Sequence, residues 1–118
     1  MPVRVLVVDD SVVCQHALCA VVTATPGFEA VGVASSGREA LDLVPVADAQ
    51  LVLLDVHMPG LDGIETSRRI RRRHPDVTVV LLTASPAMCA HGALPAIEDK
   101  HDVSPEWLAD RWRRLNAS

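Results

Sequence analysis

Residues 51–63, LVLLDVHMPGLDG, decide the fold class of this chain. They open with four aliphatic residues in a row, and this pattern predicts a strand over residues 51–56 that is buried on both faces. The apolar run ends at Asp55, and a turn rich in proline and glycine follows at once. A buried strand that ends in a carboxylate is informative, because ligands of open α/β sheets bind at the carboxyl ends of the strands.

Similar apolar runs lie on both sides of this stretch. Residues 3–8 and 77–83 predict two more strands that are buried on both faces. Weaker strands are expected at residues 29–34 and 94–98. The chain therefore contains five candidate strands.

Two helix starts between these strands carry capping-box residues. Ser36 is followed three positions later by Glu39, and Asp62 is followed in the same way by Glu65. His74, which precedes a proline, is expected to end the second of these helices. A helix is thus predicted between each pair of neighbouring strands in this part of the chain.

The first and last helices are indicated by apolar spacing. The first is expected over about residues 11–25, and the last begins at Ser104 with Pro105 in its first turn. The residues at core spacing are Cys14, Leu18, Val21 and Val22 in the first helix and Leu108, Trp112 and Leu115 in the last.

The alternation of strand and helix predicts an α/β fold, namely a doubly wound five-stranded parallel sheet with helices on both faces. Polar residues at the carboxyl ends of its strands should gather at one edge, and these are Asp9, Asp10, Asp55, Thr83 and Lys100. Three carboxylates held together repel one another unless a cation lies among them. Mg²⁺ suits this small ligand set better than Ca²⁺, because Mg²⁺ keeps several waters. No glycine-rich loop follows the first strand, which excludes dinucleotide and P-loop sites there.

Composition narrows the class of protein further. The 118 residues, 49% hydrophobic and 22% charged, suffice for one core, so residues 1–118 are expected to form one domain. A net charge of -4 opposes binding to nucleic acid or to an anionic membrane by bulk charge. The five arginines within residues 68–73 are interpreted as a solvated helix face.

The sequence pattern also bears on where the protein is located in the cell. The apolar run that begins the chain stops at Asp9 and Asp10, so neither a membrane span nor a secretory leader is expected. The cysteines, Cys14, Cys19 and Cys89, are odd in number and form no CxxC pair, which is typical of reduced thiols. These features predict a cytoplasmic protein.

Beyond these patterns, the motifs carry a family resemblance. VLVVDDS at residues 5–11, LVLLDVHMPGLDG at 51–63, LLTAS at 81–85 and a lysine after the fifth strand resemble the receiver domain of two-component response regulators. The resemblance covers nearly the whole chain and implies the flavodoxin-like receiver fold. It also implies a site whose metal ligands are Asp9, Asp10, Asp55 and the backbone carbonyl of His57, with Asp55 as phosphoacceptor and Thr83 and Lys100 at the phosphoryl oxygens.

The chemistry of these residue types agrees with that implication. Phosphoryl transfer requires positioning of the nucleophile and neutralisation of the phosphoryl oxygens, for which Mg²⁺ and a lysine ammonium are suited. Water can cleave an aspartyl phosphate, so such a domain has only self-phosphorylation and self-dephosphorylation activity. The resemblance implies a histidine kinase or phosphotransfer protein as donor, and an output domain, a protein partner or a second copy of the chain as receiver of the signal. Transcription regulation is one such output, without direct nucleic-acid or membrane contact by this domain.

The sequence departs from the receiver pattern in two places. The fifth strand carries no aromatic residue, and Ile97 or a neighbour takes that position, so the usual coupling between threonine and aromatic cannot operate. Residues 84–91 leave room for about one and a half helical turns, so the fourth helix of the family is expected to be shortened.

These departures motivate an alternative hypothesis, a degenerate receiver that acts as a dimerisation or docking module without phosphorylation. A further hypothesis comes from the chemistry alone: a haloacid-dehalogenase-like phosphatase also uses an aspartate nucleophile and Mg²⁺. That family would need a DxD motif after the first strand, whereas this chain has Asp9, Asp10 and Ser11 there.

Overall fold

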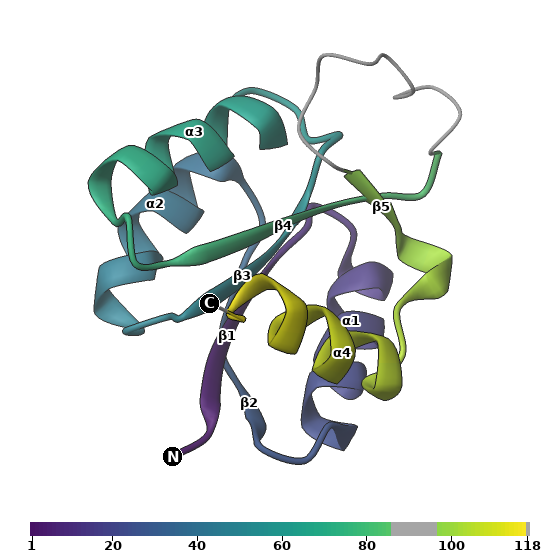
Figure 1. Cartoon of the computed structure of the whole chain (residues 1–118). Helices are drawn as coiled ribbons and strands as arrows, with labels where there is room; N and C mark the ends of the chain where they lie inside the picture. The colour runs from purple at the N-terminus through teal and green to yellow at the C-terminus, as the bar shows by residue number, and fades with distance from the viewer. Residues whose placement is uncertain (86–96, 118) are drawn as a thin grey trace.

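The computed structural model describes residues 1–85 and 97–117, and these form a parallel sheet between two layers of helices (Figure 1). Its strands are β1 Val3–Val8, β2 Phe28–Ala34, β3 Leu51–Asp55, β4 Thr78–Thr83 and β5 Ile97–Asp99. The strand order is β2-β1-β3-β4-β5, and every pair of neighbours is parallel. The predicted doubly wound five-stranded sheet is confirmed, with strand ends that differ by a few residues from the expected ones.

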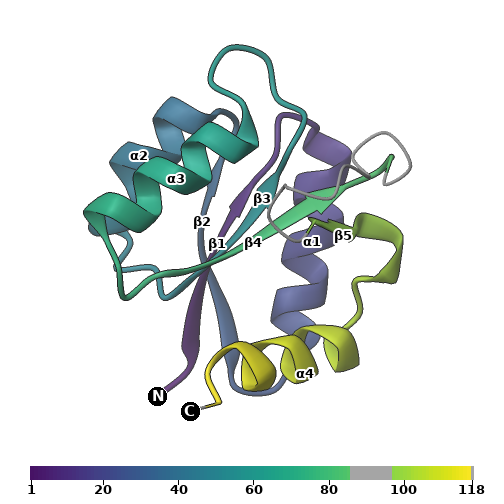
Figure 2. The ribbon, with the colours of Figure 1, turned by 45° about the horizontal axis from the view of Figure 1, so that its top comes forward.

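The helices cover the two faces of the sheet in pairs. These helices are α1 Val12–Ala24, α2 Gly37–Val46, α3 Gly63–Arg73 and α4 Pro105–Leu115, and a short 3-10 helix, η2, spans Lys100–Asp102. Figure 2 shows α2 and α3 on one face of the sheet and α1 and α4 on the other. The helices cover the faces of the sheet and leave the carboxyl ends of its strands free. The polar residues lie at these ends.

The core consists of two apolar layers separated by the sheet. Alternate residues of β1 point to opposite faces: Val5 and Val7 pack with α1 and α4, whereas Leu6 and Val8 pack with α2 and α3. These four side chains are fully buried. Each contributes about 1.5–3 kcal/mol by its removal from water. The central strands therefore form a rigid platform for the residues that follow them.

The buried face of α1 differs from the expected one. Gln15, Leu18 and Val22 are buried, whereas Cys14 and Val21 are only half-buried. A polar glutamine, which was not among the expected core residues, thus takes a buried position in α1. The reason is a hydrogen-bonding role, described below.

In α4, only one of the three expected core residues is fully buried. Leu108 is 1% exposed, Trp112 is half-buried, and Leu115 is 50% exposed. Trp112 packs edge-on against Phe28 with ring centroids 6.4 Å apart. The expectation that Leu115 belongs to the core was wrong, because half of this residue is exposed to solvent in the last turn of α4.

Both expected helix caps are present, but the glutamate carboxylates do not complete the capping boxes. Ser36 Oγ accepts a hydrogen bond from Glu39 N at 3.1 Å, and Asp62 Oδ1 accepts one from Glu65 N at 2.8 Å. The carboxylate of Glu39 accepts from Ser35 N rather than from the cap residue itself. The carboxylate of Glu65 instead forms ion pairs with arginines of its own helix. The two predicted helix starts are therefore confirmed, and only the partners of the glutamate carboxylates differ from those of a capping box.

Three further expectations concern the arginines, the membrane and the chain after β4. Arg68 and Arg72 have side chains that are 63% and 72% exposed, in agreement with a solvated face. Among the described residues, no helix combines the length and the apolar character needed to cross a bilayer.

The shortened fourth helix and the start of the expected fifth strand fall within residues 86–96, outside the described residues, and stay predictions.

Candidate functional site

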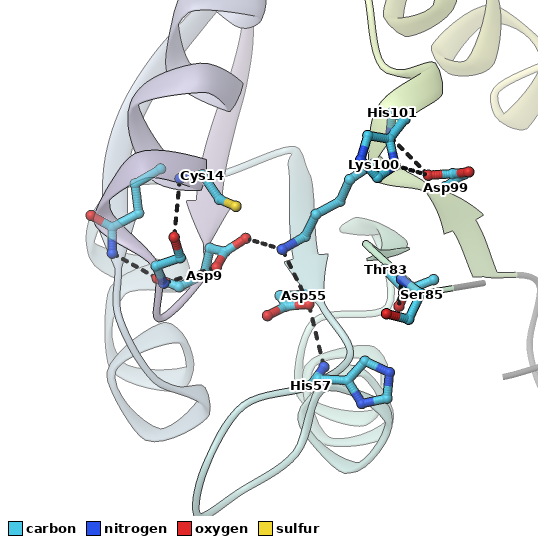
Figure 3. A network of polar contacts seen from close by, with 11 residues as sticks. Asp9, Cys14, Asp55, His57, Thr83, Ser85, Asp99, Lys100 and His101 are labelled. Carbon is cyan, nitrogen blue, oxygen red and sulfur yellow. Dashed lines mark hydrogen bonds and ion pairs between the residues drawn. The ribbon is translucent and has the colours of Figure 1, made fainter. Parts of the chain in front are cut away.

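The carboxyl ends of the strands bring four of the predicted residues together. Asp9 and Asp10 follow β1, Asp55 is the last residue of β3, and Lys100 follows β5. One carboxylate oxygen from each of the three aspartates lies within 4.8 Å of the others. Figure 3 shows Asp9, Asp55 and Lys100 pointing toward one another although they lie at the ends of three different strands. The structure therefore contains the acidic cluster that the strand ends predict.

Lys100 lies between two of these carboxylates. Its Nζ is 2.6 Å from Asp9 Oδ2 and 3.4 Å from Asp55 Oδ1. Burial opposes the charged form of this lysine, but the hydrogen bond to Asp9 and the charges of Asp55 and Asp9 outweigh it, so its pKa is raised. Lys100 is therefore a fixed positive charge at this edge of the sheet.

The surroundings of Asp55 shift its ionisation in several opposing ways. Burial raises its pKa above the ordinary value; Lys100 lowers it, the charge of Asp9 raises it, and the hydrogen bond from His57 N lowers it again. The His57 N–H donates to Asp55 Oδ1 at 3.3 Å. The net effect is a raised pKa, which means that the ionised form of Asp55 costs free energy unless more positive charge is present.

Although Asp55 is only 4% exposed, it can be reached from solvent. It lines an open hollow of about 300 Å³ together with His57, Ala84, Ser85 and Lys100. The hollow is large enough for a tetrahedral anion, so a group could approach the Asp55 carboxylate from this side. The hollow therefore gives solvent access to Asp55.

The loop after β3 is held close to Asp55 by a glycine. Gly63, the first residue of α3, donates its N–H to the carbonyl of Val56 at 3.0 Å. A Cβ atom at Gly63 would lie 2.6 Å from the Cα of Val56, a distance that real Cβ atoms do not show. Only glycine allows α3 to start this close to the strand end, and this contact fixes the backbone that carries Asp55.

Thr83 is placed differently from the other predicted site residues. It ends β4 and is fully buried, and its Oγ1 accepts a hydrogen bond from Ser85 N at 3.0 Å. Figure 3 shows Thr83 beside Ser85, and the residues that line the hollow do not include it. The hydroxyl thus lies at the correct strand end, and its contact with a phosphoryl oxygen stays a prediction.

The acidic cluster fits a Mg²⁺ ion. Asp9, Asp10 and Asp55 offer hard oxygen ligands, and their three negative charges exceed the single positive charge of Lys100. The buried Oδ2 of Asp9 contacts the ammonium of Lys100 at 2.6 Å. Asp10 is exposed, which leaves room for the waters that Mg²⁺ retains. The backbone carbonyl of His57 as a further ligand stays a prediction.

Sequence reasoning missed Gln15. This residue of α1 is 8% exposed, and its Nε2 donates to the carbonyl of Asp9 at 2.6 Å. A signal was present, because Gln15 shares the buried spacing of Leu18 and Val22 and is the polar residue of that face. A polar side chain at a core position indicates a buried hydrogen-bonding role.

Comparisons with known proteins identify the family to which this chain is similar. Residues 5–95 match the family model described as the response regulator receiver domain. The response regulator GacA of Pseudomonas viridiflava is 40% identical over 81 residues, which are 69% of this chain and 38% of that protein. A protein-glutamate methylesterase/protein-glutamine glutaminase of Trichodesmium erythraeum is 37% identical over 94 residues, 80% of this chain and 27% of that protein.

Solved structures also resemble the fold. The response regulator protein TrrA of Thermotoga maritima, solved in complex with Mg²⁺-BeF, has a TM-score of 0.78 and 29% identity, covering 98% of this chain and 99% of that one. The response regulator domain of CheB from the same organism has a TM-score of 0.80 and 23% identity, covering 100% and 99%. The chain spans only 27% and 38% of the two curated relatives named above.

Proposed function

This chain belongs to the response regulator receiver domain family, and from that premise we propose that Asp55 accepts a phosphoryl group from a histidine kinase or a phosphotransfer protein. The reaction depends on Mg²⁺, and the phosphorylated state relays the signal through a conformational change. We further propose that residues 1–118 form a single receiver domain.

The observation that carries this proposal is the acidic cluster beside the hollow. Three carboxylate oxygens lie within 4.8 Å of one another, and one of them belongs to a carboxylate that lines an open hollow. Lys100 reaches the same place from β5. Phosphoryl transfer to a carboxylate needs a reachable nucleophile and positive charge for the phosphoryl oxygens, and this edge of the sheet offers both.

The side chains of this protein have distinct roles in the proposed reaction. A carboxylate oxygen of Asp55 attacks phosphorus, and the bond between phosphorus and the donor nitrogen breaks as the new bond forms, with its electron pair left on the donor. Lys100 contributes positive charge to a phosphoryl oxygen, and the Thr83 hydroxyl donates to another. The His57 N–H orients the Asp55 carboxylate through the hydrogen bond to Oδ1.

Mg²⁺, when bound by Asp9, Asp10, Asp55 and the carbonyl of His57, supplies further neutralisation of the phosphoryl oxygens. The raised pKa of Asp55 supports this requirement, because its buried carboxylate ionises less readily without an added cation.

The test is labelling of the purified protein by acetyl phosphate, read by intact mass. We expect one added phosphoryl group in the presence of Mg²⁺, and none with EDTA or in Asp55→Ala. Asp42→Asn is the matched control, since Asp42 is exposed on α2, and it should label like the wild type. Labelling that persists in Asp55→Ala would contradict the assignment of the phosphoacceptor.

The alternative is a degenerate receiver that docks or dimerises without phosphorylation. It is favoured by Ile97, which stands in β5 where receivers usually carry an aromatic residue and which packs half-buried against the core. Absence of labelling in the wild-type protein, together with an unchanged oligomeric state with and without acetyl phosphate, would support this alternative.

The remaining partners follow from the same proposal. The signal passes to an output domain, to a protein partner or to a second copy of the chain, and transcription regulation is one output consistent with the likeness to GacA. The domain has no catalytic activity of its own beyond self-phosphorylation and self-dephosphorylation. A cytoplasmic location, where histidine kinases act, is part of this proposal.

A further inference from the structure

We propose that Gln15 is a positioning residue that sets the affinity of the acidic cluster for Mg²⁺. It does so by holding the peptide unit that joins Asp9 to Asp10. The inference rests on the proposed magnesium site and adds a residue of α1 that the motifs of the strand ends do not include.

The contacts of Gln15 connect three segments at this edge of the sheet. Its Nε2 donates to the carbonyl oxygen of Asp9 at 2.6 Å and to Ser35 Oγ at 3.1 Å. Asp9 belongs to the end of β1, Ser35 follows β2, and Gln15 lies in the first turns of α1. The buried amide therefore joins the ends of two neighbouring strands to the helix that packs on them.

These contacts control the direction of both aspartates. The carbonyl of Asp9 belongs to the planar peptide unit whose other end is the nitrogen of Asp10, so fixing its oxygen fixes the plane of that unit. The Asp9 N–H is also held, by Ala34 O at 3.0 Å, and Asp9 Oδ1 accepts from Ser11 N at 2.9 Å. With Gln15 in place, the backbone that carries the two carboxylates is held on both sides.

Gln15 faces the same side of α1 as Leu18 and Val22, so burying its amide has a cost that the hydrogen bonds to Asp9 O and Ser35 Oγ offset. The group that it holds most closely is the backbone of a carboxylate of the acidic cluster. The geometry therefore points to the orientation of the carboxylates as the role of this side chain.

The experiment compares Mg²⁺ affinity and thermal stability in two matched variants. Gln15→Met keeps the length of the side chain and removes its amide. Gln50→Met is the control, because Gln50 Oε1 also accepts from the backbone of β1, from Arg4 N at 3.2 Å, at the opposite end of the strand. The Kd for Mg²⁺ is measured by isothermal titration calorimetry, and Tm is measured in EDTA.

We expect Gln15→Met to weaken Mg²⁺ binding about tenfold, as is usual for a side chain that orients a metal ligand. Gln50→Met should keep the wild-type Kd within about twofold, because distant sites act independently. Gln15→Met loses the hydrogen bonds to Asp9 O and Ser35 Oγ, and Gln50→Met loses the part-buried one from Arg4 N. Both changes are expected to lower Tm, so a lowered Tm alone does not account for a change in Kd. An unchanged Kd in Gln15→Met, or an equal change in Gln50→Met, would overturn the inference.

Two further measurements separate the possible failures. If Gln15→Met does not fold, Ser35→Ala tests the same arrangement, because it frees the amide of Gln15 from one of its two partners. The inference then requires a weaker Kd for Mg²⁺ in Ser35→Ala, and an unchanged Kd overturns it. Wild-type protein that binds no Mg²⁺ overturns the proposed magnesium site itself, and this result is obtained before any variant is made.

Discussion

Replacing Lys100 with methionine tests whether its ammonium stabilises the acidic cluster. Methionine has a similar length and no charge, so the change removes one cation and keeps most of the packing. Asp9 and Asp55 then remain at 0% and 6% side-chain exposure without the ammonium that lies 2.6 and 3.4 Å from them. Buried carboxylates without a counter-ion are costly, and we expect a large loss of stability.

The magnitude follows from the distances. At an effective dielectric constant of about 20, unit charges at 2.6 and 3.4 Å attract by about 6 and about 5 kcal/mol. Most of this attraction is offset by the desolvation of the three groups, and removing one partner of a buried pair costs about 3–5 kcal/mol in practice. An unfolding entropy of about 2.1 cal/mol/K per residue, over 118 residues, converts about 3 kcal/mol into a fall in Tm of about 12 °C.

The assay is thermal unfolding in EDTA at about pH 7.5, followed by circular dichroism. Arg4→Met is the matched control, since Arg4 and Asp48 also form a pair, at 3.1 Å, but Asp48 is 82% exposed. That pair should contribute less than about 1 kcal/mol. The deficit of Lys100→Met should shrink as the pH is lowered, because protonation removes the unpaired charge of the carboxylates.

A second readout uses Mg²⁺ on the same two variants. Mg²⁺ should raise the Tm of Lys100→Met more than that of the wild type, because the ion no longer competes with the ammonium for Asp9. If Lys100→Met in EDTA unfolds within about 4 °C of the wild type, a difference of about 1 kcal/mol, the electrostatic account of this site is refuted.

Three other predictions concern stability. Burial first, and then the charge of Asp9, raise the folded-state pKa of Asp55 against the opposing effect of Lys100. The carboxylate therefore ionises at lower pH in the unfolded chain than in the folded one. The free energy of unfolding falls as the pH rises from the unfolded-state pKa to the folded-state pKa. Asp55→Asn should therefore be more stable than the wild type to urea at about pH 7.5 in EDTA. The gain should vanish when the pH is below the ordinary aspartate pKa of about 3.8. Lower stability of the variant at about pH 7.5 would contradict this prediction. Gly63→Ala should lower the free energy of unfolding by about 1–3 kcal/mol, because its Cβ would lie 2.6 Å from a backbone carbon, as urea denaturation would show. Ser36→Ala should cost about 1 kcal/mol, since it removes the cap of α2, and an unchanged urea midpoint would argue against that cap.

Part of the candidate site could be predicted without coordinates. Asp9 and Asp55 end apolar runs that are too hydrophobic to lie anywhere but in a buried parallel sheet, and such strands share one carboxyl edge. That argument needs only the order of residues along the chain. Thr83 and Lys100 follow from the same argument as members of this edge, but their contacts do not.

The side-chain contacts within the site could not be predicted, because they depend on how distant segments are placed in the folded chain. The contact of Lys100 with Asp9 rather than with Asp55 alone, the turn of Thr83 toward Ser85 and the exposure of Leu115 each depend on how distant segments pack. Local spacing cannot supply them, since the same spacing is compatible with several side-chain directions. The carboxylates of Glu39 and Glu65 illustrate this point, because among the described contacts one accepts from Ser35 N and the other pairs with arginines, rather than accepting from the N–H of the cap residue.

The sequence by itself determined the layers of this protein and the edge at which its acidic residues meet. Hydrophobic periodicity and strand ends are local properties, and they select an α/β sheet with a carboxylate after β1 and another at the end of β3. The tertiary structure decided which cation the carboxylates contact, how Asp55 is reached, and that Gln15 holds the backbone of Asp9. Those features depend on distances between segments far apart in the chain, and such distances are set by packing of the whole core.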